Sequence, residues 1–256
     1  MSATTTPHET APGPAATGLP LLAQADLFLA LARAFAPPSE DGLRALEEVA
    51  PLGQELAAAA GVTDPAELAQ DLAAAAAAAR RDGVAAWQGE HERLFACNVL
   101  CPIHETGYIR RDKGHVLADL AGFYRAFGVA LRGEAAERQD HLVAELEFAA
   151  ALLVLLARAE AERRGEDALV TRDALRAFCD DHLGEWVLGF ARRLEDTCRL
   201  EVHARLARAL AHAWASFARA HGYDDAPGRR LPVVEDDPGT PYECDMGGGP
   251  CEEELA

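Results

Sequence analysis

Residues 140–158 read Asp-His-Leu-Val-Ala-Glu-Leu-Glu-Phe-Ala-Ala-Ala-Leu-Leu-Val-Leu-Leu-Ala-Arg. Asp140 is suited to cap a helix, because its carboxylate can accept from the free N–H groups of the first turn. Behind it, apolar residues recur at helical spacing and also cover most of the remaining surface. A helix that is apolar nearly all round belongs inside a helical bundle. Its main stripe consists of Leu142, Leu146, Ala149, Leu153 and Leu156.

Polar groups gather at the start of this helix. His141 and Glu145 are four residues apart and therefore share a face, whereas Glu147 faces elsewhere. Carboxylates that enter a core are costly unless they are paired or hydrogen-bonded. Two interpretations stay open: these groups fix contacts between helices, or they form a polar pocket that receives a cationic ligand.

The composition narrows the class of protein. Of the 256 residues, 50% are hydrophobic and only 6% are aromatic, which favours helices. The net charge of −18 disfavours nucleic acid as a partner and favours a basic peptide or basic protein face. No apolar run is long enough to cross a bilayer, so we expect no stable membrane association. With six cysteines and no signal-peptide pattern, we expect a cytoplasmic protein with reduced thiols.

The chain divides into three parts. Residues 1–18 are rich in Thr, Pro and Ala and predict a disordered lead. Residues 222–256 carry ten acidic and two basic residues among Pro and Gly, and predict a flexible acidic tail. Residues 19–221 show helical spacing without sustained alternation, which predicts a single all-α bundle. We expect Ser39, Asp64 and Thr171 to cap helices, and the alanine-rich segment before Arg81 to be a spacer with little burial.

The cysteines and histidines raise a metal hypothesis. Cys97 and Cys101 are four apart and Cys244 and Cys251 seven apart, so four thiolates could bind zinc, although free thiols are the simpler interpretation. Cys179 and Cys198 lie on apolar helix faces and predict core positions. No Glu-x-x-His pair, His-Glu-x-x-His motif or phosphate-binding loop occurs. We expect the scattered helical histidines at the surface or at caps: His91, His182, His203, His212 and His221.

Three blocks in order resemble a known family. They are Glu92-Arg93-Leu94-Phe95 with Cys101-Pro102-Ile103-His104-Glu105-Thr106-Gly107-Tyr108, then residues 118–128 (Ala-Asp-Leu-Ala-Gly-Phe-Tyr-Arg-Ala-Phe-Gly), then residues 140–148. Together they resemble the TorD/DmsD/NarJ-type chaperones of redox-enzyme maturation, over roughly residues 87–217. The branch that serves nitrate-, chlorate-, dimethyl sulfide- and ethylbenzene-type enzymes is the most similar. There we expect Cys-Pro-Pro-Tyr-Glu-Thr, so Ile103 and His104 depart from the pattern, as does Ala149 in place of Met.

The resemblance implies a TorD-like bundle and a chaperone without catalytic residues. It implies binding of the apo catalytic subunit of a dimethyl sulfoxide reductase-family molybdenum enzyme, or of its twin-arginine signal peptide. No cofactor would be bound stably, but the client's molybdopterin cofactor could be contacted transiently. A helical metal-binding enzyme and an adaptor without a molybdenum client are the alternatives, and the chain could be a monomer or a dimer. The candidate client-binding residues are Glu105, Tyr108, Asp119, Tyr124, Asp140, His141, Glu145 and Glu147.

Overall fold

A computed structural model describes residues 18–97, 99–130 and 138–223, and every regular element in these ranges is helical. The predicted all-α architecture is therefore confirmed. The predicted lead (1–18) and tail (222–256) lie outside these ranges except for Gly18, Gly222 and Tyr223. The elements are α2 (Leu19–Phe35), α3 (Glu40–Val49), η1 (Ala50–Leu52), α4 (Gly53–Ala59), α5 (Pro65–Asp82), α6 (Val84–Glu92), η2 (Arg93–Cys97), η3 (Glu105–Gly107), α7 (Lys113–Ala126), α8 (Leu142–Ala161), α9 (Gly165–Phe178), η4 (Cys179–Leu183), α10 (Gly184–Thr197) and α11 (Glu201–His221).

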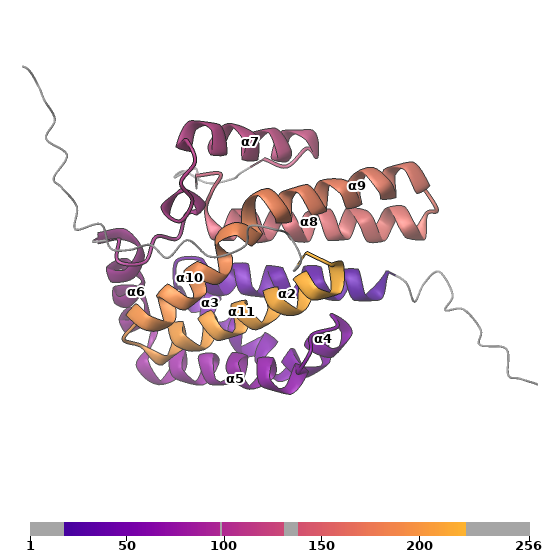
Figure 1. Ribbon diagram of the computed structural model, residues 1–256. Coiled ribbons are helices and arrows are strands. Elements are labelled where there is room, and N and C mark those ends of the chain that lie inside the picture. Colours follow the sequence, from indigo (N-terminus) through magenta and orange to yellow (C-terminus); the bar gives the residue numbers. More distant parts are fainter. Residues whose placement is uncertain (1–17, 98, 131–137, 224–256) are drawn as a thin grey trace, which may run out of the picture.

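Helix α8 lies in the interior, as its sequence predicts. It packs against α2 on one side and α9 on the other, and α11 in turn packs against α5 and α10 (Figure 1). Phe148 of α8 is 1% exposed and meets the rings of Tyr124 and Phe178 at centroid distances of 4.8 Å. Burying one such large side chain stabilises the fold by about 1.5–3 kcal/mol. The apolar faces of the helices thus close on one continuous core.

Helix α7 occupies a peripheral position. It runs along the outer side of the α8–α9 pair (Figure 1). Its contacts are made by aromatic side chains, because the Phe123 ring lies 5.7 Å from Phe178 and 5.6 Å from His182. Asp112 caps α7 by accepting from the His115 N–H. This helix forms one wall of the site described below.

Several local predictions are confirmed and others are wrong. Ser39 and Asp64 cap α3 and α5, as expected. Thr171 does not cap a helix: α9 begins at Gly165, and the Thr171 hydroxyl donates to the Asp167 carbonyl inside it. The alanine-rich segment is not a spacer, since Ala75, Ala78 and Ala79 are fully buried where α5 packs on its neighbours. Small side chains let two helix backbones approach closely. The sequence of this segment did not indicate that its alanines have this packing role.

None of the helices in the described ranges is long and apolar enough to span a membrane.

Candidate functional site

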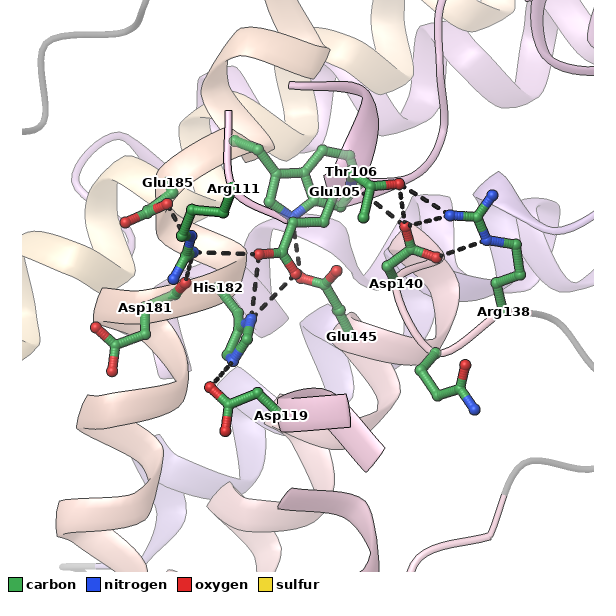
Figure 2. A network of polar contacts seen from close by, with 12 residues as sticks. Glu105, Thr106, Arg111, Asp119, Arg138, Asp140, Glu145, Asp181, His182 and Glu185 are labelled. Carbon is green, nitrogen blue, oxygen red and sulfur yellow. Dashed lines mark hydrogen bonds and ion pairs between the residues drawn. The ribbon is translucent and has the colours of Figure 1, made fainter. Parts of the chain in front are cut away.

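Two segments that are distant in the sequence are joined by backbone hydrogen bonds. The Glu105 N–H donates to the Asp140 carbonyl at 2.8 Å, and the Leu142 N–H donates to the Ile103 carbonyl at 3.0 Å. His104 and His141 form an isolated antiparallel bridge between these bonds. The irregular loop before α7 is therefore anchored on the first turn of α8, and the polar side chains of both segments meet (Figure 2).

Asp140 anchors this loop and does not cap α8, so the predicted capping role is wrong. Its side chain is fully buried, and Oδ2 accepts from the Thr106 hydroxyl at 2.7 Å. Arg138 donates from Nε to Oδ1 at 3.1 Å and from Nη2 to Oδ2 at 3.0 Å. A buried carboxylate with this many donors is strongly held. The true N-cap is His141, whose Nδ1 accepts from the Val143 N–H at 3.2 Å.

Glu105 and His182 form a buried pair at the centre of the site. Both side chains are 0% exposed, and His182 Nδ1 lies 3.1 Å from each carboxyl oxygen of Glu105. His182 comes from η4, the π-helical turn between α9 and α10. Its Nε2 lies 3.3 Å from Asp119 Oδ2 on α7, but this approach lacks the geometry of a hydrogen bond. The pair therefore connects the anchored loop to η4 and α7.

Arg111 approaches the same carboxyl group from the surface. Its Nη2 lies 3.5 Å from Glu105 Oε1 and 2.8 Å from Glu185 Oε2, and it also donates to the Asp181 carbonyl. A single guanidinium thus ties the loop to η4 and to the start of α10 (Figure 2).

Glu145 lies behind Glu105 in the core. Burial raises its pKa well above the ordinary value, and the charge of Glu105 raises it further. Its Oε2 accepts from Trp186 Nε1 at 3.0 Å, while its buried Oε1 has no hydrogen-bond partner among the described residues. The raised pKa favours the protonated form of Glu145, whose Oε2 accepts from the Trp186 indole.

The remaining candidate residues divide between the interior and the surface. Tyr108 is 8% exposed, and its hydroxyl lies 3.6 Å from Cys101 Sγ. Tyr124 is 3% exposed, and its hydroxyl donates to the Gln139 carbonyl at 2.6 Å. Burial raises the pKa of both hydroxyls. Glu147, by contrast, is exposed, and the Asp119 side chain is 61% exposed.

His141 and His104 lie at the edge of the cluster. Their rings meet edge to face with centroids 5.1 Å apart. Burial lowers the pKa of His141 to about 4, with a smaller contribution from His104. Burial also lowers the pKa of His104, so both imidazoles are neutral near pH 7. The structure therefore groups six of the eight candidates around the loop and α8, namely Glu105, Tyr108, Asp119, Asp140, His141 and Glu145. Tyr124 also contacts the segment before α8, through its hydrogen bond to the Gln139 carbonyl. Glu147 is exposed and points away from this group of residues.

The zinc hypothesis concerns residues that lie mostly outside the described part. This is the case for Cys244, Cys251 and the side chain of Cys97. Burial raises the pKa of the Cys101 thiol to about 11, which disfavours the thiolate that a metal requires. No group of three or more metal-ligating side chains occurs within the described ranges. Cys179 is buried, as expected for a core residue, whereas Cys198 is half-buried at the end of α10.

Sequence reasoning misplaced two histidines and missed several polar partners. His182 and His203 are buried and not at the surface, with exposed fractions of 0% and 2%. The partners not named among the candidate residues are Thr106, Arg111, Arg138, His182 and Trp186. Thr106 follows Glu105 in the family block of residues 101–108, so the resemblance could have indicated Thr106 as a site residue. Nothing in the sequence near His182 marks it, because its partners come from three other segments.

The chain matches one family of known proteins. Residues 60–192, about half of the chain, match the model of the family described as nitrate reductase delta subunit. The chain belongs to this family. It is 31% identical over 175 residues to the chlorate reductase assembly chaperone of Ideonella dechloratans, a match that covers 68% of this chain and 78% of that one. The expectation that the chain belongs to the chaperone family is therefore confirmed, because this relative is named as an assembly chaperone.

Two further relatives match over shorter stretches. The selenate reductase assembly chaperone of Thauera selenatis is 44% identical over 36% of this chain and 47% of its own length. The perchlorate reductase assembly chaperone of Dechloromonas aromatica is 35% identical over 44% of this chain and 48% of its own length. The chain thus spans about half the length of these two relatives. A crystal structure described as a redox enzyme maturation protein of Archaeoglobus fulgidus aligns with a TM-score of 0.47 and 23% identity, over 75% of this chain and 93% of that one.

Proposed function

We propose that this chaperone binds the apo catalytic subunit of a dimethyl sulfoxide reductase-family molybdenum enzyme and holds it until the cofactor is inserted. The observation that carries the proposal is the match to a chlorate reductase assembly chaperone over 68% of the chain. The matched relatives are named for selenate, chlorate and perchlorate reductases, which are oxyanion reductases. A client of that class is therefore the first to test.

The site favours a polypeptide client with basic groups. The whole chain carries a net charge of −18, which steers association with a basic partner. Among the candidate residues, Asp119 and Glu147 present exposed carboxylates, while Glu105, Asp140 and Glu145 are fully buried. We assign the buried acids to positioning of the loop and the exposed acids to contact with the client. Asp119 contacts the buried His182 and also has an exposed side chain, so we assign it both to positioning of the site and to contact with the client.

Where the client carries a twin-arginine signal peptide, the chaperone would bind that peptide in the cytoplasm and delay export. It would hold no cofactor of its own, and it would meet the molybdopterin cofactor only while the client receives it. Two adjacent guanidiniums followed by an apolar stretch suit a rim of carboxylates beside aromatic side chains.

The proposal is tested with the molybdenum reductase catalytic subunit of the same organism, purified in its apo form and in its cofactor-loaded form. We expect calorimetric titration to show stoichiometric binding to the apo form and at least tenfold weaker binding to the loaded form. In cells that lack the chaperone, the subunit should contain much less molybdenum. An adaptor role would instead leave the molybdenum content unchanged and give equal affinity for both forms.

A further inference from the structure

Helix α8 is capped by a histidine, a residue that titrates near neutral pH. His141 is the N-cap, and its Nδ1 accepts from the Val143 N–H at 3.2 Å. The residues preferred at this position, Asp, Asn, Ser and Thr, accept through an oxygen that binds no proton between about pH 5 and pH 8. Because Nδ1 accepts here, we assign the single ring hydrogen to Nε2. The cap of the central helix therefore depends on a lone pair that a proton can occupy.

A proton on Nδ1 changes the cap from an acceptor into a donor. The new N–H of His141 would face the Val143 N–H, and the hydrogen bond between them would be lost. The N–H groups of the first turn also carry partial positive charge, which repels an imidazolium ring at this end of the helix. Val143 is 6% exposed, so its N–H would be left without an acceptor close to the core.

The same residue holds the loop before α7. The backbone of His141 lies between the two hydrogen bonds that anchor this loop, and it forms the antiparallel bridge with His104. The rings of His104 and His141 also meet edge to face, with centroids 5.1 Å apart. A charged His141 ring that leaves its position at the cap therefore disturbs the anchor of the loop as well.

The groups around His141 disfavour its charged form. Burial is the largest cause that lowers its pKa to about 4, and the rings of His104 on the loop and His91 on α6 lower it further. Burial lowers the pKa of these two rings as well, that of His91 to about 4. Asp140 favours the charged form of His141 but is the smallest of these influences, and Arg138 already pairs with its carboxylate.

We propose that His141 is an acid-sensitive latch, whose protonation releases the cap of α8 and loosens the loop that is anchored there. The inference goes beyond the proposed function, because it concerns how the site is held together and does not depend on which client binds.

The direction of the effect follows from proton binding. In the open state the solvated ring has a pKa near its ordinary value of about 6.5, whereas in the closed state the pKa is about 4. Between these values the open state binds more protons, so the closed state loses stability as the pH falls. The opening constant should rise about tenfold for each pH unit within this window. Glu145, one turn further along α8, has a raised pKa and so offers little charge to offset the imidazolium.

Native-state hydrogen exchange of the full chain, followed by NMR, tests the latch. The amides to follow are those of the cap and the anchor, Glu105, Leu142 and Val143. After correction for the intrinsic pH dependence of exchange, we expect these amides to exchange at least about tenfold faster at pH 5 than at pH 6.5.

Two variants separate the cap from other titrating groups. His141→Asn keeps a side-chain acceptor at the N-cap and removes the titratable ring. We expect the acceleration to be about tenfold smaller in this protein, because one proton fewer is bound on opening. His115→Asn is the matched control, since His115 is exposed on α7 and its ring is solvated in both states. This variant should show the full acceleration of the wild type.

A wild-type acceleration in His141→Asn, or protection in the wild type that does not change with pH, would overturn the inference. The imidazole signals of the wild type give a second measurement that needs no variant to fold. We expect the titration of the His141 ring and the shift of the Val143 amide to share one midpoint. If the ring titrates while the Val143 amide stays unchanged, the cap does not depend on the ring and the inference is wrong.

Discussion

At the scale of the residue, the site contains one buried acid whose pKa is raised, Glu145. Glu145 is fully buried, its pKa is raised by burial and by the nearby charge of Glu105, and its Oε2 accepts from Trp186. Keeping the proton avoids placing a second negative charge beside Glu105 in the core. Glu105 is then free to receive Arg111 and His182. A proton on Glu145 would thus lower the repulsion between the two buried carboxyl groups.

Replacement of Glu145 by glutamine tests this state through the pH dependence of stability. An unfolded glutamate releases its proton above about pH 4.3, whereas folded Glu145 retains it up to its raised pKa. The wild type therefore loses free energy of unfolding as the pH rises through this window, because the folded state binds more protons. The Glu145→Gln variant has no ionisable group at this position, so its free energy of unfolding should not show this decrease with pH. We expect its thermal midpoint, relative to the wild type, to increase as the pH rises above about 4.3.

The exposed neighbour Glu147 provides the control for this measurement. Glu147→Gln should show no such trend, because its carboxylate is solvated in the folded and unfolded states alike. Parallel pH profiles of the wild type and Glu145→Gln would mean that Glu145 ionises normally in the folded protein.

At the scale of the element, close helix packing depends on small side chains. The second half of the buried face of α5 consists of alanines, of which Ala75, Ala78 and Ala79 are each 0% exposed; Leu68, Asp71 and Leu72 form the first half. Helix α5 packs against α11, α4 and α3, so the spacing of several helices depends on this face. Alanine contributes little transfer free energy, but it sets how closely the backbones approach.

A pair of leucine substitutions on α5 separates packing from helix propensity. Ala78→Leu places a large side chain where no space exists, and we expect it to lower the free energy of unfolding by about 1–3 kcal/mol. Ala77→Leu makes the same chemical change at the neighbouring exposed position and should be nearly neutral. Urea denaturation measures both. Equal stability of the two variants would show that the alanine face is loosely packed.

At the scale of the whole molecule, the core extends to the end of the described chain. Tyr223 is 3% exposed, its N–H donates to the Ala218 carbonyl at 2.8 Å, and its ring lies 5.7 Å from Phe217. Gly222 precedes it with a φ of 70°, a left-handed conformation that ends α11 and turns Tyr223 back onto the helix. Tyr223, the second residue after the last helix, therefore belongs to the packed body.

Two truncations test where the body ends. Deletion of residues 224–256, a segment rich in Pro, Gly and acidic residues, should leave the thermal midpoint nearly unchanged, since its composition offers little apolar surface. Deletion from Gly222 onward also removes Tyr223 and should lower the midpoint measurably, because burial of a large side chain stabilises by about 1.5–3 kcal/mol. A large loss in the shorter deletion would show that the acidic segment packs on the bundle.

The sequence by itself determined the helical architecture and the central position of α8. The reason is local: helical spacing, capping residues such as Ser39 and Asp64, and the lack of alternation are properties of neighbouring residues. The family resemblance also named residues of the loop at Glu105 and of the start of α8 as candidates for client binding. Because a carboxylate in an apolar helix needs a partner, Glu145 was recognisable as unusual from its neighbours alone.

Only the tertiary structure decided which groups are partners and which remain accessible. Asp140 looked like a cap because a cap is judged from its own helix, but its buried oxygens bind Thr106 and Arg138. His182 looked like a surface residue because its partners, Glu105 and Asp119, come from other segments. Burial and hydrogen bonding between distant segments depend on how helices pack, and spacing within one helix carries no information about that packing.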